Sequence, residues 1–428
     1  MPKDTLTLPE PSKFQAWAVV LSSALFFFYI FIQMNLFNAV SPALMKEFHF
    51  SASEIGQIYA FYSYANIICV FPAGILLDRF SIKKTLLLSF IISTVALYLF
   101  STTSQFWVMN ATRLLCGVAG SFCFLASVKL ASRWFKPEHM AVAIGVVVTM
   151  AMLGGAVAQT PLAILTDAVG WRMALQLVAV LGVVLMIIQL LIIRDYPKGT
   201  ENYFAAQRSQ LLDQIGFWPS LKMALGNIQN WLSGIYISLI NLPMFVLSVW
   251  GTLYLVQEHG LTRILASTAT MLMFVGLMIG SPLAGWISDK VGRRKIPMIV
   301  GAILSILVIL ALMFTPTMPV YAELALYFVL GIIISAQVIG YPVIAESNPP
   351  AITATATGIA SLLIFAAGAL LPLFGWLLEF SGDKQIVDSV SVYSAHDFML
   401  ANSLMLGGVV IALICSFFIK ETYCKAKN

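Results

Sequence analysis

One arginine interrupts an otherwise apolar stretch and is the residue whose charge most needs a partner. Arg113 lies about seven residues, or roughly 10 Å at 1.5 Å per helical residue, inside the stretch 106–132. A guanidinium near the middle of a bilayer is unfavourable by about 2.5–3.5 kcal/mol, so we expect Arg113 to face a hydrated cavity or a partner. It would suit a solute carboxylate, because guanidinium groups bind carboxylates through paired hydrogen bonds. The alternative is a side chain that reaches back to the membrane surface.

Uncharged polar side chains recur in other apolar stretches and could contact the same solute. Tyr29 and Gln33 are four residues apart and therefore lie on one face of a helix. Amides and aromatic rings suit a small polar organic solute, although hydrogen bonds between helices would use the same residues. We assign Tyr59, Tyr62 and Tyr64 to packing. With Arg113, the candidate substrate-binding residues are Tyr29, Gln33, Asn35, Gln159, Asn241, Trp250, Gln337 and Tyr341.

A charged motif occurs twice, 211 residues apart, which indicates an internal duplication. GILLDRFSIKK contains Gly74, Asp78, Arg79 and Lys83, and GWISDKVGRRK contains Gly285, Asp289, Lys290, Arg293 and Arg294. A carboxylate beside several cations at a helix end can form charge-assisted hydrogen bonds. We therefore predict that these residues form a gate that holds one end of the molecule closed and releases it. The alternative is that the cations only fix orientation in a membrane.

The composition and the lengths of the apolar stretches indicate what positions these residues. The chain of 428 residues is 60% hydrophobic and 10% charged, which excludes a soluble enzyme, a nucleic-acid binder and a disordered protein. A membrane-spanning helix needs roughly 20 apolar residues, and alternating barrel strands are not seen. We predict an all-α membrane protein with twelve spans: 14–41, 53–77, 85–103, 106–132, 139–163, 172–193, 228–255, 265–288, 296–314, 321–345, 354–378 and 398–420.

The polar connections divide these spans into two sets. We expect a six-helix bundle over 1–193, a cytoplasmic linker over 194–227 and a second six-helix bundle over 228–428. About 19 of the 24 Lys and Arg residues fall on the side of the N-terminus, so both termini are placed in the cytoplasm. The five cysteines have no chelating spacing and lie mostly in helices, so neither a metal site nor a disulfide is expected.

Several catalytic motifs are absent from the sequence. No G-x-x-x-x-G-K-[ST], H-E-x-x-H or G-x-S-x-G motif occurs, so we expect no enzyme, no cofactor and no nucleotide hydrolysis. No carboxylate lies at mid-membrane in either half. Proton coupling usually uses such groups, which leaves Asp78 and Glu323, at the ends of spans, as candidate coupling residues. Uncoupled facilitation stays open.

The duplicated motif resembles the G-x-x-x-D-R/K-x-G-R-R/K-K loop signature of the major facilitator superfamily. The second copy is nearly complete, whereas the first departs at Ser81 and Ile82. The resemblance implies two six-helix repeats that open alternately to either side, with helices one, four, seven and ten around a central cavity. The run from Arg113 through Gly117 to Gly120 is similar to the family's fourth-helix motif, in which the arginine is associated with substrate binding or proton coupling.

Two further stretches narrow the resemblance. KLASRWFKP, which starts at Lys129, and ESNPP, which starts at Glu346, are similar to the phagosomal-transporter-type permeases of intracellular bacteria. That resemblance implies import of amino acids or nucleosides across the bacterial inner membrane. The stretch from Gly145 to Gly155 lacks the central Gly-Pro of drug exporters, which argues against export.

We therefore expect a secondary transporter of a small polar organic solute, an amino acid in the first place, with protons as a possible coupling ion. The alternatives are a carrier of a carboxylate siderophore, a nucleoside or another organic anion, and a non-transporting membrane receptor. We expect a monomer in contact with membrane lipid and no nucleic-acid partner.

Overall fold

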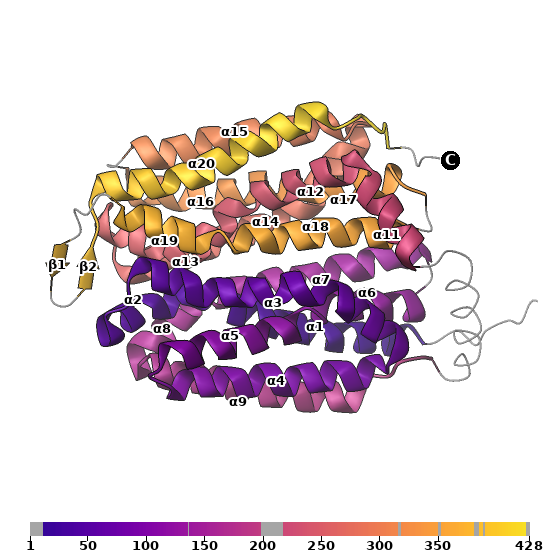
Figure 1. Cartoon of the computed structure of the whole chain (residues 1–428), viewed down its shortest axis with the longest axis horizontal. Coiled ribbons are helices and arrows are strands. Elements are labelled where there is room, and N and C mark those ends of the chain that lie inside the picture. The colour runs from indigo at the N-terminus through magenta and orange to yellow at the C-terminus, as the bar shows by residue number, and fades with distance from the viewer. Residues whose placement is uncertain are drawn as a thin grey trace, which may run out of the picture.

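The computed structural model describes residues 12–135, 137–197, 217–315, 318–349, 352–380, 385–387 and 390–424, and the molecule is built almost entirely of helices that run in nearly the same direction (Figure 1). Part of the expected linker, residues 198–216, lies outside the described residues. So do the side chains of Asp78 and Arg79, although their backbone is helical.

The helices before the linker occupy one side of the molecule and those after it the other (Figure 1). The first group consists of α1 (Lys13–Asn35), α2 (Phe37–Phe48), α3 (Ala52–Arg79), α4 (Ile82–Thr102), α5 (Phe106–Gly120), α6 (Cys123–Trp134), α7 (Pro137–Val157), α8 (Thr160–Val169) and α9 (Trp171–Ile192). We call it the N-terminal helices.

The second group, the C-terminal helices, also contains one short β-hairpin. It consists of α11 (Phe217–Gly226), α12 (Ile228–Ile240), α13 (Leu242–Gln257), α14 (Arg263–Val291), α15 (Lys295–Phe314), α16 (Val320–Ile334), the 3₁₀ helix η1 (Ser335–Ile339), α17 (Gly340–Glu346), α18 (Thr353–Gly368), α19 (Leu371–Glu379), β1 (Gln385–Val387), β2 (Val390–Val392) and α20 (Ala395–Phe418). Strands β1 and β2 pair antiparallel, with Ile386 opposite Ser391. This hairpin was not predicted from the sequence.

The predicted spans agree with the helices. Within the described residues, eleven helices or helix pairs are long and apolar enough to cross a membrane. Helix α3, 28 residues long, covers the remaining predicted stretch, 53–77. The all-α fold class is confirmed.

Six of the predicted spans are interrupted by a break between two helices, and the breaks recur in the first, fourth and fifth spans of each group of helices. The breaks separate α1 from α2, α5 from α6, and α7 from α8; they also separate α12 from α13, α16 from α17, and α18 from α19. Prolines at the starts of α8, α13 and α19 explain three of them, because proline lacks the N–H that would continue the helix. Freed backbone groups at such breaks are typical of transporter binding sites.

Asparagine side chains satisfy some of the backbone carbonyls at these breaks. The Nδ2 of Asn241 donates to the carbonyl of Ile237 at 2.9 Å, and the Nδ2 of Asn35 donates to that of Phe31 at 2.9 Å. Each asparagine thereby replaces a backbone donor four residues along the helix. The amide side chains singled out from the sequence thus have a structural role at the breaks.

The two ends of the molecule differ in chemistry. We call the end that carries the α3–α4 and α14–α15 loops the signature end, and the other the far end. The C-terminal end of the chain lies at the signature end, and the β-hairpin lies at the far end (Figure 1).

Candidate functional site

Arg113 lies in the interior of the N-terminal helices. Its side chain projects from α5, the residue is 1% exposed, and its Nη1 donates to the backbone carbonyl of Gln33 on α1 at 2.9 Å. The guanidinium carbon is 5.1 Å from the ring centroid of Phe37 and 5.2 Å from that of Tyr62. Such rings stabilise a cation through their electron-rich faces. The snorkelling alternative does not fit this burial.

Two nitrogens of this buried guanidinium have no partner. Nε and Nη2 of Arg113 make no hydrogen bond, and among the described residues no carboxylate forms an ion pair with Arg113. Burying a charge without compensation is strongly unfavourable. The two free donors therefore mark a place for water or for an anionic group, and a carboxylate would match them.

Further polar atoms without a hydrogen-bond partner lie on α1 and α3, the helices that contact the side chain of Arg113. Both side-chain polar atoms of Gln33, the Oδ1 of Asn35 and the hydroxyls of Tyr29 and Tyr59 are buried without a hydrogen-bond partner. Most buried polar atoms in proteins are satisfied, so several such atoms on α1 and α3 indicate a wet or ligand-binding interior. We call Arg113, Gln33, Tyr59 and Tyr62 the arginine site; the ring of Tyr29 instead stacks on that of Phe90 of α4 at 5.2 Å, and its hydroxyl lies against Gly182 of α9.

Tyr59 and Tyr62 lie in the arginine site, although both were predicted from the sequence to be packing residues. Tyr59 and Tyr62 are three residues apart and so share one face of α3, and the ring of Tyr59 lies 5.9 Å from that of Phe37. The three-residue spacing of Tyr59 and Tyr62 was the sequence signal that could have indicated a shared role for these two side chains. A methyl group at Gly117 would collide with the carbonyl of Tyr62, so this glycine lets α5 approach α3 closely, as the sequence motif predicts.

Gln159 belongs to a different group, which joins the N-terminal to the C-terminal helices. Its Oε1 accepts hydrogen bonds from the Nδ2 of Asn38 and, at 3.0 Å, from the hydroxyl of Thr270. Asn38 also donates to Thr270 at 2.8 Å and accepts from the backbone amide of Thr252 at 3.0 Å. Gln159 therefore forms hydrogen bonds between helices. We call Asn38, Gln159, Thr252 and Thr270 the bridging amides and hydroxyls.

The remaining predicted substrate-binding residues lie in the C-terminal helices. Asn241, at the break between α12 and α13, donates to the Oε1 of Gln337 in η1. Trp250 is buried, its ring stacks on that of Phe374 at 6.0 Å, and its Nε1 has no partner. Tyr341 lies half-buried in α17. The structure thus divides the predicted residues among several groups, and it does not bring Gln159, Asn241 or Gln337 into hydrogen-bond contact with Arg113.

The far end is closed by polar contacts between the two groups of helices. Arg263 on α14 contacts Asp167, the hydroxyl of Thr166 at 3.0 Å and the carbonyl of Ala39. Glu379 accepts from the backbone amide of Ala52 at 3.2 Å. Within the described residues, the hydrogen bonds between the N-terminal and the C-terminal helices fall into three places. They lie at the contacts of Arg263 and Glu379, at the bridging amides and hydroxyls, and between Thr160 and Thr268. Within the described part of the chain, the hydrogen bonds between the two groups of helices therefore lie at the helix breaks or on their far-end side.

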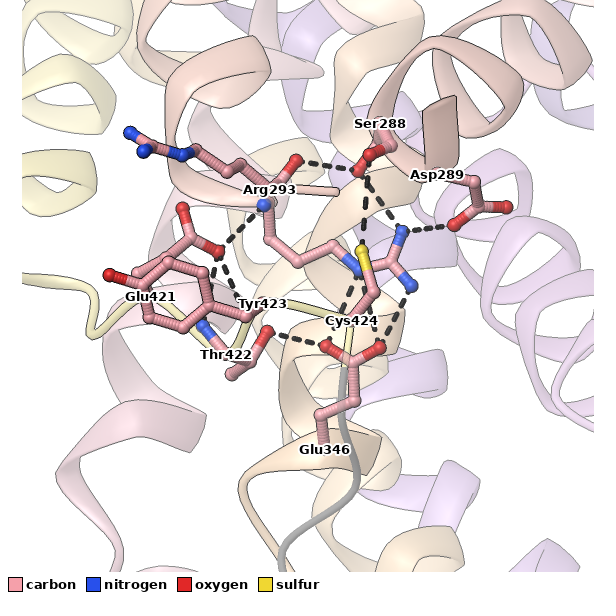
Figure 2. Close-up of polar contacts among 9 residues, drawn as sticks. Ser288, Asp289, Arg293, Glu346, Glu421, Thr422, Tyr423 and Cys424 are labelled. Carbon is pink, nitrogen blue, oxygen red and sulfur yellow. Dashed lines mark hydrogen bonds and ion pairs between the residues drawn. The ribbon is translucent and has the colours of Figure 1, made fainter. Parts of the chain in front are cut away.

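The second copy of the signature forms a compact charged group at the signature end (Figure 2). Arg294 contacts Asp289 at 2.6 Å and Glu346, at the end of α17, at 2.8 Å. We call these three residues the C-terminal charge cluster. Burial lowers the pKa of Arg294, but the hydrogen bonds to Glu346 and Asp289 outweigh it and raise that pKa above its usual range. Glu346 was not singled out as a gating residue from the sequence, because it lies 52 residues from Arg294.

The C-terminal tail binds the same loop. Glu421 accepts from the backbone amides of Arg294 at 2.8 Å and Lys295 at 3.0 Å, and so caps the start of α15. Thr422 donates to Glu346. Burial raises the pKa of Glu421, but four backbone hydrogen bonds outweigh it and lower that pKa below its usual value.

The first copy of the signature is capped in the same way. Asp195, three residues after the end of α9, accepts from the backbone amide of Lys83 at 2.7 Å, as Glu421 does three residues after α20. The two loops differ where the first copy departs from the family pattern. Gly292 adopts a left-handed conformation with φ of 67°, whereas Ser81 is extended and its hydroxyl caps α4.

The other predicted gating residues have looser surroundings. Gly74 and Gly285 have no neighbour that an added Cβ would meet, so close packing is not what requires glycine there. The ammonium group of Lys290 lies 4.8 Å from the ring centroid of Trp286. Asp78 and Arg79 carry side chains outside the described part of the structure.

Glu323 forms a buried pair with a histidine. Its Oε1 lies 2.7 Å from the Nδ1 of His259, and both side chains are 1% exposed. The second oxygen of Glu323 and the Nε2 of His259 have no partner, and the ring of Tyr254 lies 5.0 Å from that of His259. A cavity of about 370 Å³ lined by Tyr254, Glu258 and His396 lies beside this pair. The histidine could not be paired with Glu323 from the sequence, because 64 residues separate them.

Metal chemistry has no support among the described residues. They contain no group of three or more His, Cys, Asp or Glu side chains that could hold a metal ion, and their cysteines are free.

The sequence and the fold match known proteins over most of the chain. A model of the Major Facilitator Superfamily matches residues 21–372 and 235–423. The chain is 23% identical over 360 residues to the lysosomal dipeptide transporter MFSD1 of Danio rerio, covering 79% of this chain and 77% of that one. It is 24% identical over 372 residues to the probable galactarate/D-glucarate transporter GudP of Escherichia coli (strain K12), with 79% and 82% covered.

A solved structure has the same fold. It is the crystal structure of a bacterial homolog of the human lysosomal transporter Spinster in an inward-facing and unoccupied conformation. The TM-score is 0.74 at 17% identity, and the match covers 96% of this chain and 97% of that one.

Proposed function

Because the chain belongs to the major facilitator superfamily and is a multi-pass transporter of small organic molecules rather than an enzyme, we propose that it moves a small polar solute that bears a carboxylate, an amino acid in the first place, by alternating access. The membrane is proposed to be the bacterial inner membrane, with the signature end and both termini in the cytoplasm. The protein acts as a monomer of two six-helix bundles, over 1–193 and 228–428, joined by the linker 194–227.

The observation that carries this proposal is the buried guanidinium of Arg113 with two free donors. A carboxylate from a solute would accept from both nitrogens and would neutralise the charge that the fold leaves uncompensated. The orphaned amide of Gln33 and the hydroxyl of Tyr59 would bind the polar remainder of the solute.

A second candidate, an organic anion such as a sugar acid, is favoured by the charges at the arginine site. No carboxylate of the described residues pairs with Arg113, so the ammonium group of an amino acid would find only neutral oxygens. A solute that carries only negative charge and hydroxyls needs no such partner. The sugar-acid substrate in the name of the Escherichia coli relative supports this candidate, and the dipeptide in the name of the Danio rerio relative supports the first.

Alternating access is supported by where the hydrogen bonds between the two groups of helices lie. The far-end contacts close one side, while the charge clusters at the signature end lie within one group of helices each. In the proposed cycle the far-end contacts break, the signature-end residues Gly74, Asp78, Arg79, Lys83, Gly285, Asp289, Lys290, Arg293 and Arg294 gate the opposite side, and the solute at Arg113 changes access.

Proton coupling, if present, is assigned to Glu323 and His259, with Asp78 as the second candidate. A buried carboxylate beside an imidazole can exchange a proton with the cavity at Tyr254 and Glu258. Glu323 lies in the first turn of α16, and the break that follows this helix lies at its other end. Protonation of the Glu323–His259 pair would therefore affect the closure of the far end and not the bound solute directly.

The test is a ligand screen followed by transport. Purified protein is screened by thermal shift against amino acids, dipeptides, nucleosides and sugar acids, because a bound solute raises the melting temperature by mass action. Each stabilising solute is then assayed for counterflow in proteoliposomes. We expect counterflow of at least one carboxylate solute by the wild type and by Lys222→Gln, which removes an exposed cation remote from Arg113, but not by Arg113→Ala.

Two results would contradict the proposal. Undiminished counterflow in Arg113→Ala would remove Arg113 from the binding site. A solute that binds tightly through Arg113 but shows no counterflow would instead identify a membrane receptor.

A further inference from the structure

An apolar groove runs along the outside of the C-terminal helices near the signature end. It has a volume of about 280 Å³ and lies between α14, α15 and α16. Its walls include Leu283, Ile287 and Val291 of α14 and Ile296 and Val300 of α15, each of which is at least 39% exposed. In a membrane protein such a groove faces lipid tails, so the chemistry at its end decides what binds there.

Small residues make the groove. Gly280, Ala284, Gly301 and Ala336 all line it, and a methyl group at Gly301 would press against Ala336. Because these side chains are short, the helices pack closely beneath the larger residues of the rim. The resulting groove is narrow and apolar along its length, which suits a single hydrocarbon chain.

Cations mark the end of the groove at the α14–α15 loop. Lys290 directly precedes the groove residue Val291, and its ammonium group lies over the exposed ring of Trp286. Arg293 lies in the loop between Val291 and Ile296, and its side chain extends away from the carboxylates of the C-terminal charge cluster (Figure 2). Both cations are exposed.

These two cations are the ones that the protein leaves available in this loop. Arg294 is bound by Asp289 and Glu346, and the ammonium group of Lys295 donates to the carbonyl of Phe417. Within the described residues, neither Lys290 nor Arg293 forms an ion pair. Asp289, the adjacent carboxylate, has its charge engaged by Arg294.

We propose that this groove binds an anionic phospholipid, with one acyl chain between α14, α15 and α16 and the phosphate in contact with Lys290 and Arg293. Each basic side chain near a membrane surface contributes attraction for anionic lipid, and basic pockets between helices bind such headgroups. Trp286 is exposed four residues before Lys290, and exposed tryptophans are enriched at the headgroup level of membranes. The site is independent of the solute that the protein moves.

The first copy of the signature supplies an internal comparison. At the offset of 211 residues, Ile82 occupies the position of Arg293, so the first loop lacks one of the two cations. The proposed site is therefore specific to the C-terminal helices, and the lipid would stabilise the loop that carries the C-terminal charge cluster.

The experiment measures lipid binding rather than transport. Native mass spectrometry of delipidated protein is performed with phosphatidylglycerol and phosphatidylcholine of identical acyl chains, and with glycerol 3-phosphate as a headgroup without a chain. The variants are Lys290→Gln/Arg293→Gln, Ala284→Phe, which fills the groove, and Lys84→Gln, which removes an exposed cation from the first turn of α4, in the first copy of the signature. Melting temperatures establish that each variant is folded.

We expect the wild type and Lys84→Gln to bind phosphatidylglycerol roughly tenfold more tightly than phosphatidylcholine. The double variant should bind both lipids equally, Ala284→Phe should weaken both, and glycerol 3-phosphate should bind far more weakly than phosphatidylglycerol. Equal binding of the two lipids by the wild type, or an equal loss in Lys84→Gln, would overturn the headgroup site. Glycerol 3-phosphate binding as tight as that of the lipid would overturn the role of the groove.

Discussion

Asn38 and Thr270 join the two groups of helices through a hydrogen bond of 2.8 Å between the amide Nδ2 and the threonine hydroxyl. Asn38 follows the break between α1 and α2, and Thr270 lies in α14, 232 residues away. The amide of Thr252 donates to the other side-chain atom of Asn38, so this asparagine is saturated by partners from across the boundary and from Gln159. We infer that Asn38 stabilises the state in which the far end is closed.

Asn38→Ala should therefore favour opening of the far end. Removing the amide deletes the two hydrogen bonds by which Asn38 joins the groups of helices, to the hydroxyl of Thr270 and from the backbone amide of Thr252, each of which contributes about 0.5–1.5 kcal/mol to the closed state. Thr160 is buried while the far end is closed. A cysteine introduced at this position should therefore be alkylated severalfold faster in the Asn38→Ala background. Asn110→Ala is the control, because the Asn110 amide donates only within α5, to Phe106. Equal acceleration by the control would refute the assignment.

Arg113→Met should separate binding from folding. Methionine removes the buried charge while keeping much of the volume, so the ligand-free protein should melt at the same or a higher temperature. The rise in melting temperature produced by a carboxylate solute should disappear, since about 1.5–3 kcal/mol per charged hydrogen bond is lost. A large drop in the melting temperature of the ligand-free variant would instead indicate that Arg113 has a structural role.

Asp289→Asn and Glu346→Gln remove the same charge from two sides of Arg294 and should differ in stability. The Glu346 side chain is 11% exposed, so its loss leaves a nearly buried guanidinium without its main partner, an effect of about 3 kcal/mol. The Asp289 side chain is 67% exposed, and its loss should change the free energy of unfolding by less than about 1 kcal/mol. Chemical denaturation in detergent measures both values. We expect Asp289→Asn to slow turnover in counterflow with little change in apparent affinity, and a change in affinity alone would argue against gating.

Glu421→Gln should weaken the C-terminal cap in a pH-dependent way. Hydrogen bonds from backbone amides hold the pKa of Glu421 in the folded protein below its ordinary value of 4.5, so the ionised carboxylate stabilises the fold. This contribution is fully present above pH 4.5 and is lost as the pH falls through the lower folded pKa. The melting temperature of Glu421→Gln should therefore be below that of the wild type at pH 7, and the difference should shrink below pH 4.5. Asp195→Asn, at the equivalent cap, should also lower the melting temperature at pH 7.

Glu323→Gln should distinguish coupled from uncoupled transport. If the Glu323–His259 pair carries the coupling proton, uptake driven by an inward proton gradient should fall at least tenfold while counterflow, which needs no net proton movement, persists. Glu47→Gln, which removes a carboxylate of the N-terminal helices that pairs with Arg172, is the control. Unchanged gradient-driven uptake in Glu323→Gln would leave Asp78 or uncoupled facilitation.

The sequence by itself determined the fold class, the number of spans and the family. These follow from local properties, because about 20 consecutive apolar residues must form a helix wherever lipid surrounds them, and because both copies of the signature are contiguous. For the same reason it could be predicted that Arg113 needs a partner or a hydrated cavity and does not face lipid. The glycines after it indicated close packing, which the contact of Gly117 with Tyr62 bears out.

Only the tertiary structure decided which polar groups meet. Arg113 binds the carbonyl of Gln33, 80 residues away, and Glu346 joins Arg294 across 52 residues, distances over which hydropathy carries no information. Gln159 could have faced a solute or another helix, and the packing of α7 and α8 against α14 placed it between helices. Partners of buried polar groups are fixed by how helices from distant parts of the chain pack, and this depends on shape complementarity that no single span encodes.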